Sequence, residues 1–290
     1  MKEQKDYNSI SPSAEYLVRL KAFTTIPFAK EAATLLIHDT GELGSINPEH
    51  QNTKAFFRWL IHFENRYRTV ENLLRNTHPQ RILEISSGYS FRGLAWCFEQ
   101  PVHFIDTDLP DLVAAKNKLI PLLAAGRNTP MKGVFELLPL NVMDTDRFTE
   151  VINHFGEGPV SIVNEGLLVY LGMEEKRQLC DTICQVLDQR GGDWITGDIY
   201  IRSETDETYA HHPEWDAFRK KHRLNENRFD SFAAAEAFFA SCGLEVVERQ
   251  ALAPDDLSCL DLPGVNKHDI LRLLAHKPHA RESWRLRVRQ

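Results

Sequence analysis

The sequence lacks a long apolar run. None of its uninterrupted apolar stretches approaches the roughly 20 residues that a membrane-spanning helix needs. Its first residues, Met1–Asp6, are polar and do not resemble a secretory signal. We therefore expect a cytoplasmic, soluble protein that has no membrane partner.

Cysteine is scarce, and basic residues are not in excess. The five cysteines are odd in number and scattered, and only Cys180 and Cys184 lie close together, without the further Cys or His residues of a zinc site. This pattern predicts reduced thiols and no metal site. With 34 Lys and Arg residues against 41 Asp and Glu residues, the net charge is -7. A broad basic surface for nucleic acid is therefore not expected.

Glycine is sparse at the turn where a dinucleotide site would need it. The turn Ser86–Ser90 follows the first apolar run and contains only Gly88, whereas the nicotinamide fingerprint has three glycines, because its backbone must approach a pyrophosphate closely. S-adenosylmethionine (SAM) has no phosphate and tolerates a looser turn. The turn favours a methyl donor, and a nicotinamide-dependent oxidoreductase is the weaker alternative.

Short apolar runs alternate with helical patterns after residue 80. The expected strands cover residues 82–85, 102–105, 134–138, 160–164, 194–196, 244–248 and 284–288, and the expected helices 91–99, 111–120, 174–187, 231–242 and 267–276. Such alternation predicts a Rossmann-like α/β fold, with a mostly parallel seven-stranded sheet and helices on both faces.

Two further segments complete the expected organisation. Residues 1–76 contain helical patterns only, at 14–20, 28–38 and 52–76, which predicts an N-terminal helical cap ahead of a core at 77–290. A polar and aromatic stretch at 199–230 interrupts the alternation after the fifth strand. It is either a lid that binds substrate or an ordinary surface excursion.

Carboxylates stand at the ends of the first two expected strands. Asp106 ends the second apolar run, where an acid can accept hydrogen bonds from both hydroxyls of a ribose. Glu84 ends the first run and either organises the following turn or caps the next helix. Together these positions predict an adenosine-type ligand, with Asp106 as its ribose anchor.

Several segments resemble successive motifs of the leucine carboxyl methyltransferase family, whose members use SAM. These are residues 84–92, 106–110 with 114–116, 140–144 and 164–171, together with residues 10–14 and 65–68. The sequence Glu-Gly-Leu-x-x-Tyr-Leu at 165–171 is the most specific of them. The family includes enzymes that methylate the carboxyl terminus of protein phosphatase 2A, and bacterial O-methyltransferases associated with polyketide biosynthesis.

The resemblance implies roles for the side chains around the adenosine. Gly88 would let the turn approach the methionine part of the cofactor, beside Glu84. Asn141 and Val142 match the pair that faces the adenine, although the family usually has Asp in place of Asn141. The nearby Asp144 would either supply the acceptor instead or cap the following helix.

The resemblance also implies how the amino-acid end of the cofactor is held. Arg66, or Arg68 in its place, would pair with the carboxylate, and Glu165 would lie near the ammonium group. The turn departs from the family pattern, because Ser86 replaces a glycine and Ser90 stands where Asp is common. These changes leave cofactor binding as the expectation.

The expected activity is SAM-dependent O-methyl transfer to a carboxylate or hydroxyl of a small molecule, with S-adenosylhomocysteine (SAH) as product. The phosphatase carboxyl terminus is the less expected acceptor, and a non-catalytic SAM-binding member is the alternative function. A carboxylate needs no base, whereas a hydroxyl is helped by one. Candidate catalytic residues are Asp198, His211 or its neighbour His212, and Tyr170, which could shape the transfer pocket. The sequence does not indicate the oligomeric state.

Overall fold

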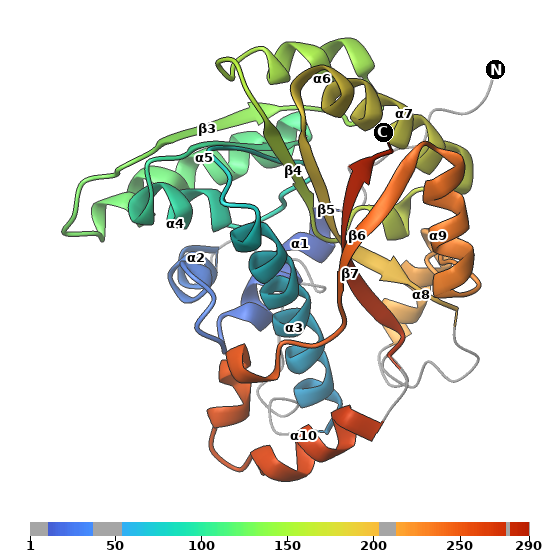
Figure 1. The fold of residues 1–290 in the computed structure, drawn as a ribbon. Helices are drawn as coiled ribbons and strands as arrows, with labels where there is room; N and C mark the ends of the chain where they lie inside the picture. The colour runs from blue at the N-terminus through green and yellow to red at the C-terminus, as the bar shows by residue number, and fades with distance from the viewer. Residues whose placement is uncertain (1–10, 37–53, 203–212, 277–278, 290) are drawn as a thin grey trace.

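A computed structural model describes residues 11–36, 54–202, 213–276 and 279–289. Within this part of the chain, seven strands form one sheet in the order β3-β2-β1-β4-β5-β7-β6 (Figure 1). The strands are β1 Arg81–Glu84, β2 His103–Asp108, β3 Val134–Pro139, β4 Val160–Asn164, β5 Gly192–Tyr200, β6 Leu244–Gln250 and β7 Arg281–Val288.

The sheet is parallel except at one edge. Strands β1 to β5 pair in parallel, and β7 runs antiparallel between β5 and β6. The predicted Rossmann-like fold is confirmed. The chain builds outward from β1 to β3 and then returns to place β4 on the other side of β1. Ligands of open α/β sheets bind at such a switch point, beyond the carboxyl ends of the strands.

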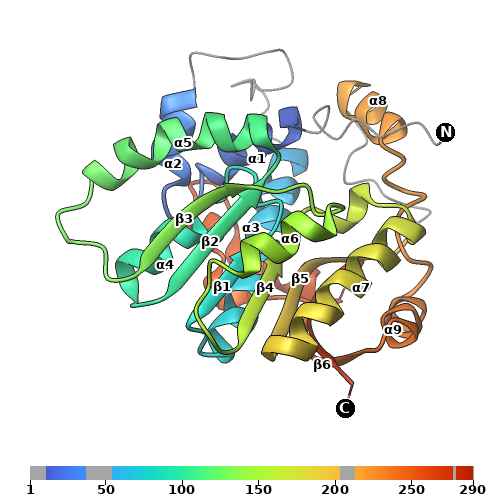
Figure 2. The ribbon, with the colours of Figure 1, turned by 90° about the horizontal axis from the view of Figure 1, so that it is seen from above.

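Helices cover both faces of the sheet (Figures 1 and 2). They are α1 Ser11–Lys21, α2 Ala29–Leu35, α3 Lys54–Asn76, α4 Arg92–Glu99, α5 Pro110–Ala125, α6 Thr145–Ile152, α7 Met173–Arg190, α8 Pro213–Lys221, α9 Phe232–Ser241 and α10 Lys267–His276. Buried side chains of α6, α7 and α9 form one core with the sheet. Those of α3 and α4 form a second core against the same strands. None of the described helices is both long and apolar enough to cross a membrane.

The N-terminal helices pack against the sheet and against one another. The helix predicted at residues 52–76 is α3, and its side chains Val70, Leu73 and Leu74 are buried against the strands. Helix α1 packs across α3. The cap at 1–76 thus contributes a helix that lies directly on the sheet, and the boundary at residue 76 stays a prediction.

Candidate functional site

A cavity opens at the carboxyl ends of the parallel strands. It encloses about 1500 Å³ when the open space at its mouth is counted. Its walls come from α1, α3, the turn after β1, the ends of β2 and β5, and the loops after β3 and β4. Residues Arg219, Leu224 and Arg228 of the predicted 199–230 insertion close one side.

The turn after β1 exposes its backbone to this cavity. Ser86 and Gly88 both have left-handed backbones, with φ of 52° and 54°, a conformation that favours glycine. Ser86 therefore occupies a position where the glycine of the related motif would be less strained. The N–H of Ser87 donates to the carbonyl of Thr107 at 2.9 Å, which ties the turn to β2.

The acid that lines the cavity from β2 is Asp108, the last residue of the strand. Its Oδ2 accepts from the N–H of Gly88 at 2.7 Å and its Oδ1 from the N–H of Leu109 at 2.8 Å. Two carboxylate oxygens have about four lone pairs in all. Acceptor capacity is thus left for two hydroxyls of a ribose.

Asp106, the predicted ribose anchor, does not line the cavity. Its side chain is fully buried beneath the turn, and Oδ2 pairs with Lys116 at 2.7 Å. Lys116 also donates to the hydroxyl of Ser87 at 3.0 Å. This position makes Asp106 a support of the turn, which corrects its predicted place in the cavity wall, and the carboxylate of β2 that lines the cavity is Asp108.

Glu84 is likewise buried below the cavity wall. It pairs with the guanidinium of Arg92 at 2.7 Å, and burial raises the pKa of Glu84 to about 7 although Arg92 opposes the shift. Glu84 was predicted either to organise the turn or to cap the next helix, and its position beneath the turn agrees with the first role. Glu84 acts through Arg92, which lies four residues after Gly88.

The loop after β3 supplies an apolar wall with one amide. Asn141 and Val142 both line the cavity, as predicted for the pair that faces the adenine. The Oδ1 atom of Asn141 accepts from the N–H of Met143 at 3.1 Å, which leaves the amide Nδ2 as a donor. Asp144 instead caps α6, because its carboxylate accepts from the N–H of Arg147 at 3.0 Å.

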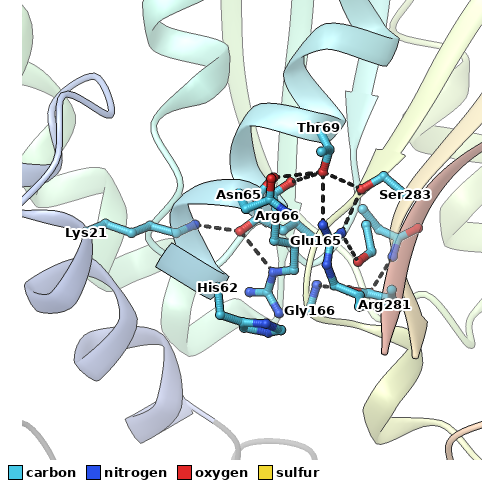
Figure 3. A network of polar contacts seen from close by, with 12 residues as sticks. Lys21, His62, Asn65, Arg66, Thr69, Glu165, Gly166, Arg281 and Ser283 are labelled. Carbon is cyan, nitrogen blue, oxygen red and sulfur yellow. Dashed lines mark hydrogen bonds and ion pairs between the residues drawn. The ribbon is translucent and has the colours of Figure 1, made fainter. Parts of the chain in front are cut away.

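Three cations surround Glu165, which follows β4. Lys21 of α1 lies 2.6 Å from Oε1, and Arg66 of α3 lies 3.3 Å from the same oxygen; both point toward Glu165 in Figure 3. Arg92 pairs with Oε2 at 2.9 Å. Burial alone would raise the pKa of Glu165, but these three charges hold it far below its ordinary value.

The sequence predicted that Arg66 and Glu165 lie together at the amino-acid end of the cofactor. It did not indicate the other two cations, Lys21 and Arg92. Lys21 continues the stripe Ala14, Leu17, Val18 at helical spacing, and this apolar face could have indicated that it points inward. Arg92 is fully buried and also contacts Glu84, and no local pattern distinguishes it from a surface arginine. Among the described residues, no group of His, Cys, Asp or Glu could hold a metal ion.

The predicted catalytic residues separate into three cases. Tyr170 lines the cavity, and its hydroxyl contacts that of Ser13 at 3.2 Å. His211 lies outside the described residues. Asp198 is buried away from the cavity, where its two oxygens accept hydrogen bonds from the side chain of Asn164 and from three backbone N–H groups at 2.6–3.1 Å. We therefore correct the prediction for Asp198, which organises the loop after β4.

Tyr200 is a polar residue of the cavity that the sequence did not single out. It ends β5 and lines the cavity beside Arg66. Its hydroxyl lies 2.9 Å from Nε2 of His62 and 3.2 Å from Nη1 of Arg66. The tyrosine was visible in the sequence only as one of several aromatic residues of the 199–230 stretch.

Comparison with known proteins shows likeness in structure only. No protein-family model and no curated protein matches the sequence. A DUF574 family protein from Streptomyces avermitilis superposes with a TM-score of 0.56 at 14% identity, over 96% of this chain and 97% of its own. Magnesium protoporphyrin IX methyltransferase from Synechocystis, with bound SAH, gives 0.45 at 8% identity over 83% and 97%. A LepI variant in complex with SAH and substrate analogue gives 0.45 at 11% identity over 73% of this chain, which spans 44% of the LepI chain. The first likeness shows that this chain shares its α/β fold with that protein.

Proposed function

We propose that this protein is an S-adenosylmethionine-dependent O-methyltransferase that acts on a hydroxyl or carboxylate of a small molecule. The observation that carries the proposal is the order of groups along one cavity. An acid with spare acceptor capacity, an apolar wall with an amide, and a cluster of two cations and one carboxylate lie at the switch point of the sheet. A ribose, an adenine and an amino-acid end need these groups in this arrangement.

The amino-acid end of SAM carries both a carboxylate and an ammonium group. Lys21 and Arg66 offer the carboxylate two positive donors, and Glu165 offers the ammonium an acceptor. One negative charge among the cations also prevents the wall from being purely cationic. The cluster therefore suits a zwitterion better than it suits a phosphate, which would be repelled by Glu165.

When bound, SAM supplies an electrophilic methyl group. The role of the protein is then to hold the acceptor oxygen behind that methyl group and to exclude water. We call Lys21, Arg66 and Glu165 the Lys–Arg–Glu cluster. The cavity wall next to this cluster is lined by Tyr170, Tyr200 and Phe63, and Arg219 and Arg228 of the insertion close the cavity on one side. These groups form a partly apolar compartment with positive charge, which agrees with an acceptor oxygen that carries or develops negative charge.

Thermal unfolding with added ligands tests the proposal. A ligand at 100 times its Kd stabilises the folded state by about 2.7 kcal/mol, and this corresponds to a rise of roughly 5–10 °C in Tm for a domain of this size. SAM and SAH should both raise the Tm, and NAD⁺ should not. A rise with NAD⁺ alone would replace the proposal by the oxidoreductase alternative.

Replacing Lys21 by Met should weaken SAH binding by about 10- to 100-fold, since a charge-assisted hydrogen bond to the ligand carboxylate is lost. Calorimetry measures the affinity. The affinity for 5′-methylthioadenosine, which lacks the amino-acid end, should stay unchanged. The matched control is Lys118→Met on the exposed face of α5. Equal losses for both ligands would show that Lys21 does not contact the amino-acid end.

A further inference from the structure

We infer that Tyr200, with His62 behind it, takes the proton from a hydroxyl acceptor. This makes Tyr200 a catalytic residue and hydroxyl-bearing molecules the substrate class, and the inference rests on the proposed function. Tyr200 is 6% exposed and lines the cavity at the end of β5. The loop that carries Glu165 follows the neighbouring strand β4, so the phenol oxygen lies at the same edge of the sheet as the Lys–Arg–Glu cluster.

The hydroxyl of Tyr200 joins two side chains of one helix. Nε2 of His62 lies 2.9 Å from the Tyr200 oxygen, and Arg66 donates to that oxygen at 3.2 Å. His62 and Arg66 are one turn apart on α3 and extend toward the same region (Figure 3). The rings of His62 and Tyr200 are 5.7 Å apart between centroids. Both contacts therefore come from a single rigid element.

The direction of proton transfer follows from the donors available. A guanidinium can only donate, so Arg66 occupies one of the two lone pairs of the Tyr200 oxygen. When the phenol proton points to an unprotonated Nε2 of His62, the second lone pair stays available to an O–H group in the cavity. In the opposite arrangement, with a proton on Nε2, the oxygen would have both lone pairs filled and could only donate.

The charges around His62 keep its ring neutral. Burial, and then the positive charges of Arg281, Arg66 and Arg228, hold the pKa of His62 well below its ordinary value, against the smaller opposing effect of Glu165. A neutral imidazole has one unprotonated nitrogen, which can accept the phenol proton during the transfer, and the lowered pKa makes the ring release that proton again at neutral pH. His62 as a residue is nevertheless partly exposed, so a proton that it receives has a route to solvent.

Two protons and one methyl group move in the transfer step. The acceptor O–H gives its proton to the Tyr200 oxygen while Tyr200 passes its own proton to Nε2 of His62. The acceptor oxygen forms a bond to the methyl carbon as the carbon–sulfur bond breaks, and the electron pair of that bond stays on sulfur. The products are a methyl ether, SAH and one proton, which leaves from His62. The positive charge of Arg66 stabilises the negative charge that develops on the oxygens during transfer.

Nitrogen NMR of ¹⁵N-histidine-labelled protein tests the direction of the hydrogen bond without an acceptor. The His62→Gln variant assigns the His62 signals. We expect an unprotonated, pyridine-type Nε2 that accepts a hydrogen bond, and a shift of this signal in Tyr200→Phe. A protonated Nε2 at neutral pH would overturn the inference. Calorimetry with SAH on the same samples tests the proposed function separately, because cofactor binding does not depend on the His62 tautomer.

Turnover with labelled SAM and a panel of phenols and carboxylic acids provides a second readout. Tyr200→Phe should lower kcat for phenols by about 10²- to 10⁴-fold, with a smaller loss at higher pH, where the acceptor ionises by itself. Its affinity for SAH should stay within about twofold of the wild type. A loss of kcat that does not change with pH, or transfer to carboxylic acids alone, would contradict a role in proton removal.

Discussion

Replacing Glu165 by Gln should lower the free energy of unfolding by about 3–5 kcal/mol, which is the usual cost of removing one partner from a buried ion pair. The side chain of Glu165 is 4% exposed, and Lys21, Arg66 and Arg92 all lie within 3.3 Å of its oxygens. An amide oxygen still accepts hydrogen bonds, but it does not balance three buried cations. Urea unfolding at pH 7 measures the change.

The effect should depend on pH in a defined direction. Because the pKa of Glu165 in the folded protein lies far below 4.5, the value of an unperturbed Glu, the carboxylate stabilises the folded state above the unfolded pKa. That stabilisation is lost as the pH falls through 4.5 and below, when only the unfolded state takes up the proton. The difference between wild type and Glu165→Gln should therefore be constant from pH 8 to 5 and should narrow in more acidic solution.

Glu150→Gln is the matched control for this experiment. Glu150 pairs with Arg147 at 2.6 Å, but the two side chains are 63% and 37% exposed. An exposed pair contributes about 0–1 kcal/mol, so this variant should unfold close to the wild type. If both variants lost the same small amount of stability, the charge cluster would be solvated and the account of Glu165 would be wrong.

Replacing Asp106 by Asn should also cost about 3–5 kcal/mol of stability, but it should leave cofactor affinity nearly unchanged. Asp106 and Lys116 are both fully buried and 2.7 Å apart, so the variant leaves an ammonium group without a counter-charge. Asp106 does not line the cavity. We expect a lower midpoint in urea and, under native conditions, an SAH affinity within about threefold of the wild type.

The double variant Asp106→Asn, Lys116→Met serves as the control. Removing both charges leaves no unpaired ion in the interior, so the double variant should be more stable than Asp106→Asn alone. A double variant as unstable as the sum of the two single variants would show that the pair does not act as a unit. A loss of SAH affinity of 100-fold in the stable fraction of Asp106→Asn would restore Asp106 as the ribose anchor.

The sequence was sufficient for the order of the strands, because most of them are continuous apolar runs, but helices α6 and α8 were not predicted. The predicted fifth strand covered only residues 194–196, whereas β5 covers Gly192–Tyr200. Asp193, Thr196 and Asp198 interrupt the apolar pattern, yet they are buried because ion pairs or hydrogen bonds satisfy them. Such partners lie far away in the sequence and leave no local signal. The same reason explains why β7 begins at Arg281, three residues before the predicted start.

The candidate site was predictable in outline and not in its contacts. Asp106 and Asp108 are two residues apart on β2, so their side chains extend on the same side of the strand, and only the depth of the cavity separates their roles. Lys116, on the following helix, pairs with Asp106 and so keeps this carboxylate out of the cavity wall. Likewise, Lys21 and Glu165 are 144 residues apart, and no spacing rule connects α1 with the loop after β4.

The most direct test of the proposed site is a calorimetric titration of SAH into the wild type and Asp108→Ala. We expect saturable binding of one SAH by the wild type and a loss of about 10- to 100-fold in affinity for Asp108→Ala, because hydrogen bonds from the ribose hydroxyls to a carboxylate are removed. Asp144→Ala, which changes a helix cap outside the cavity, should bind like the wild type. No binding by the wild type, or unchanged binding by Asp108→Ala, would contradict the account.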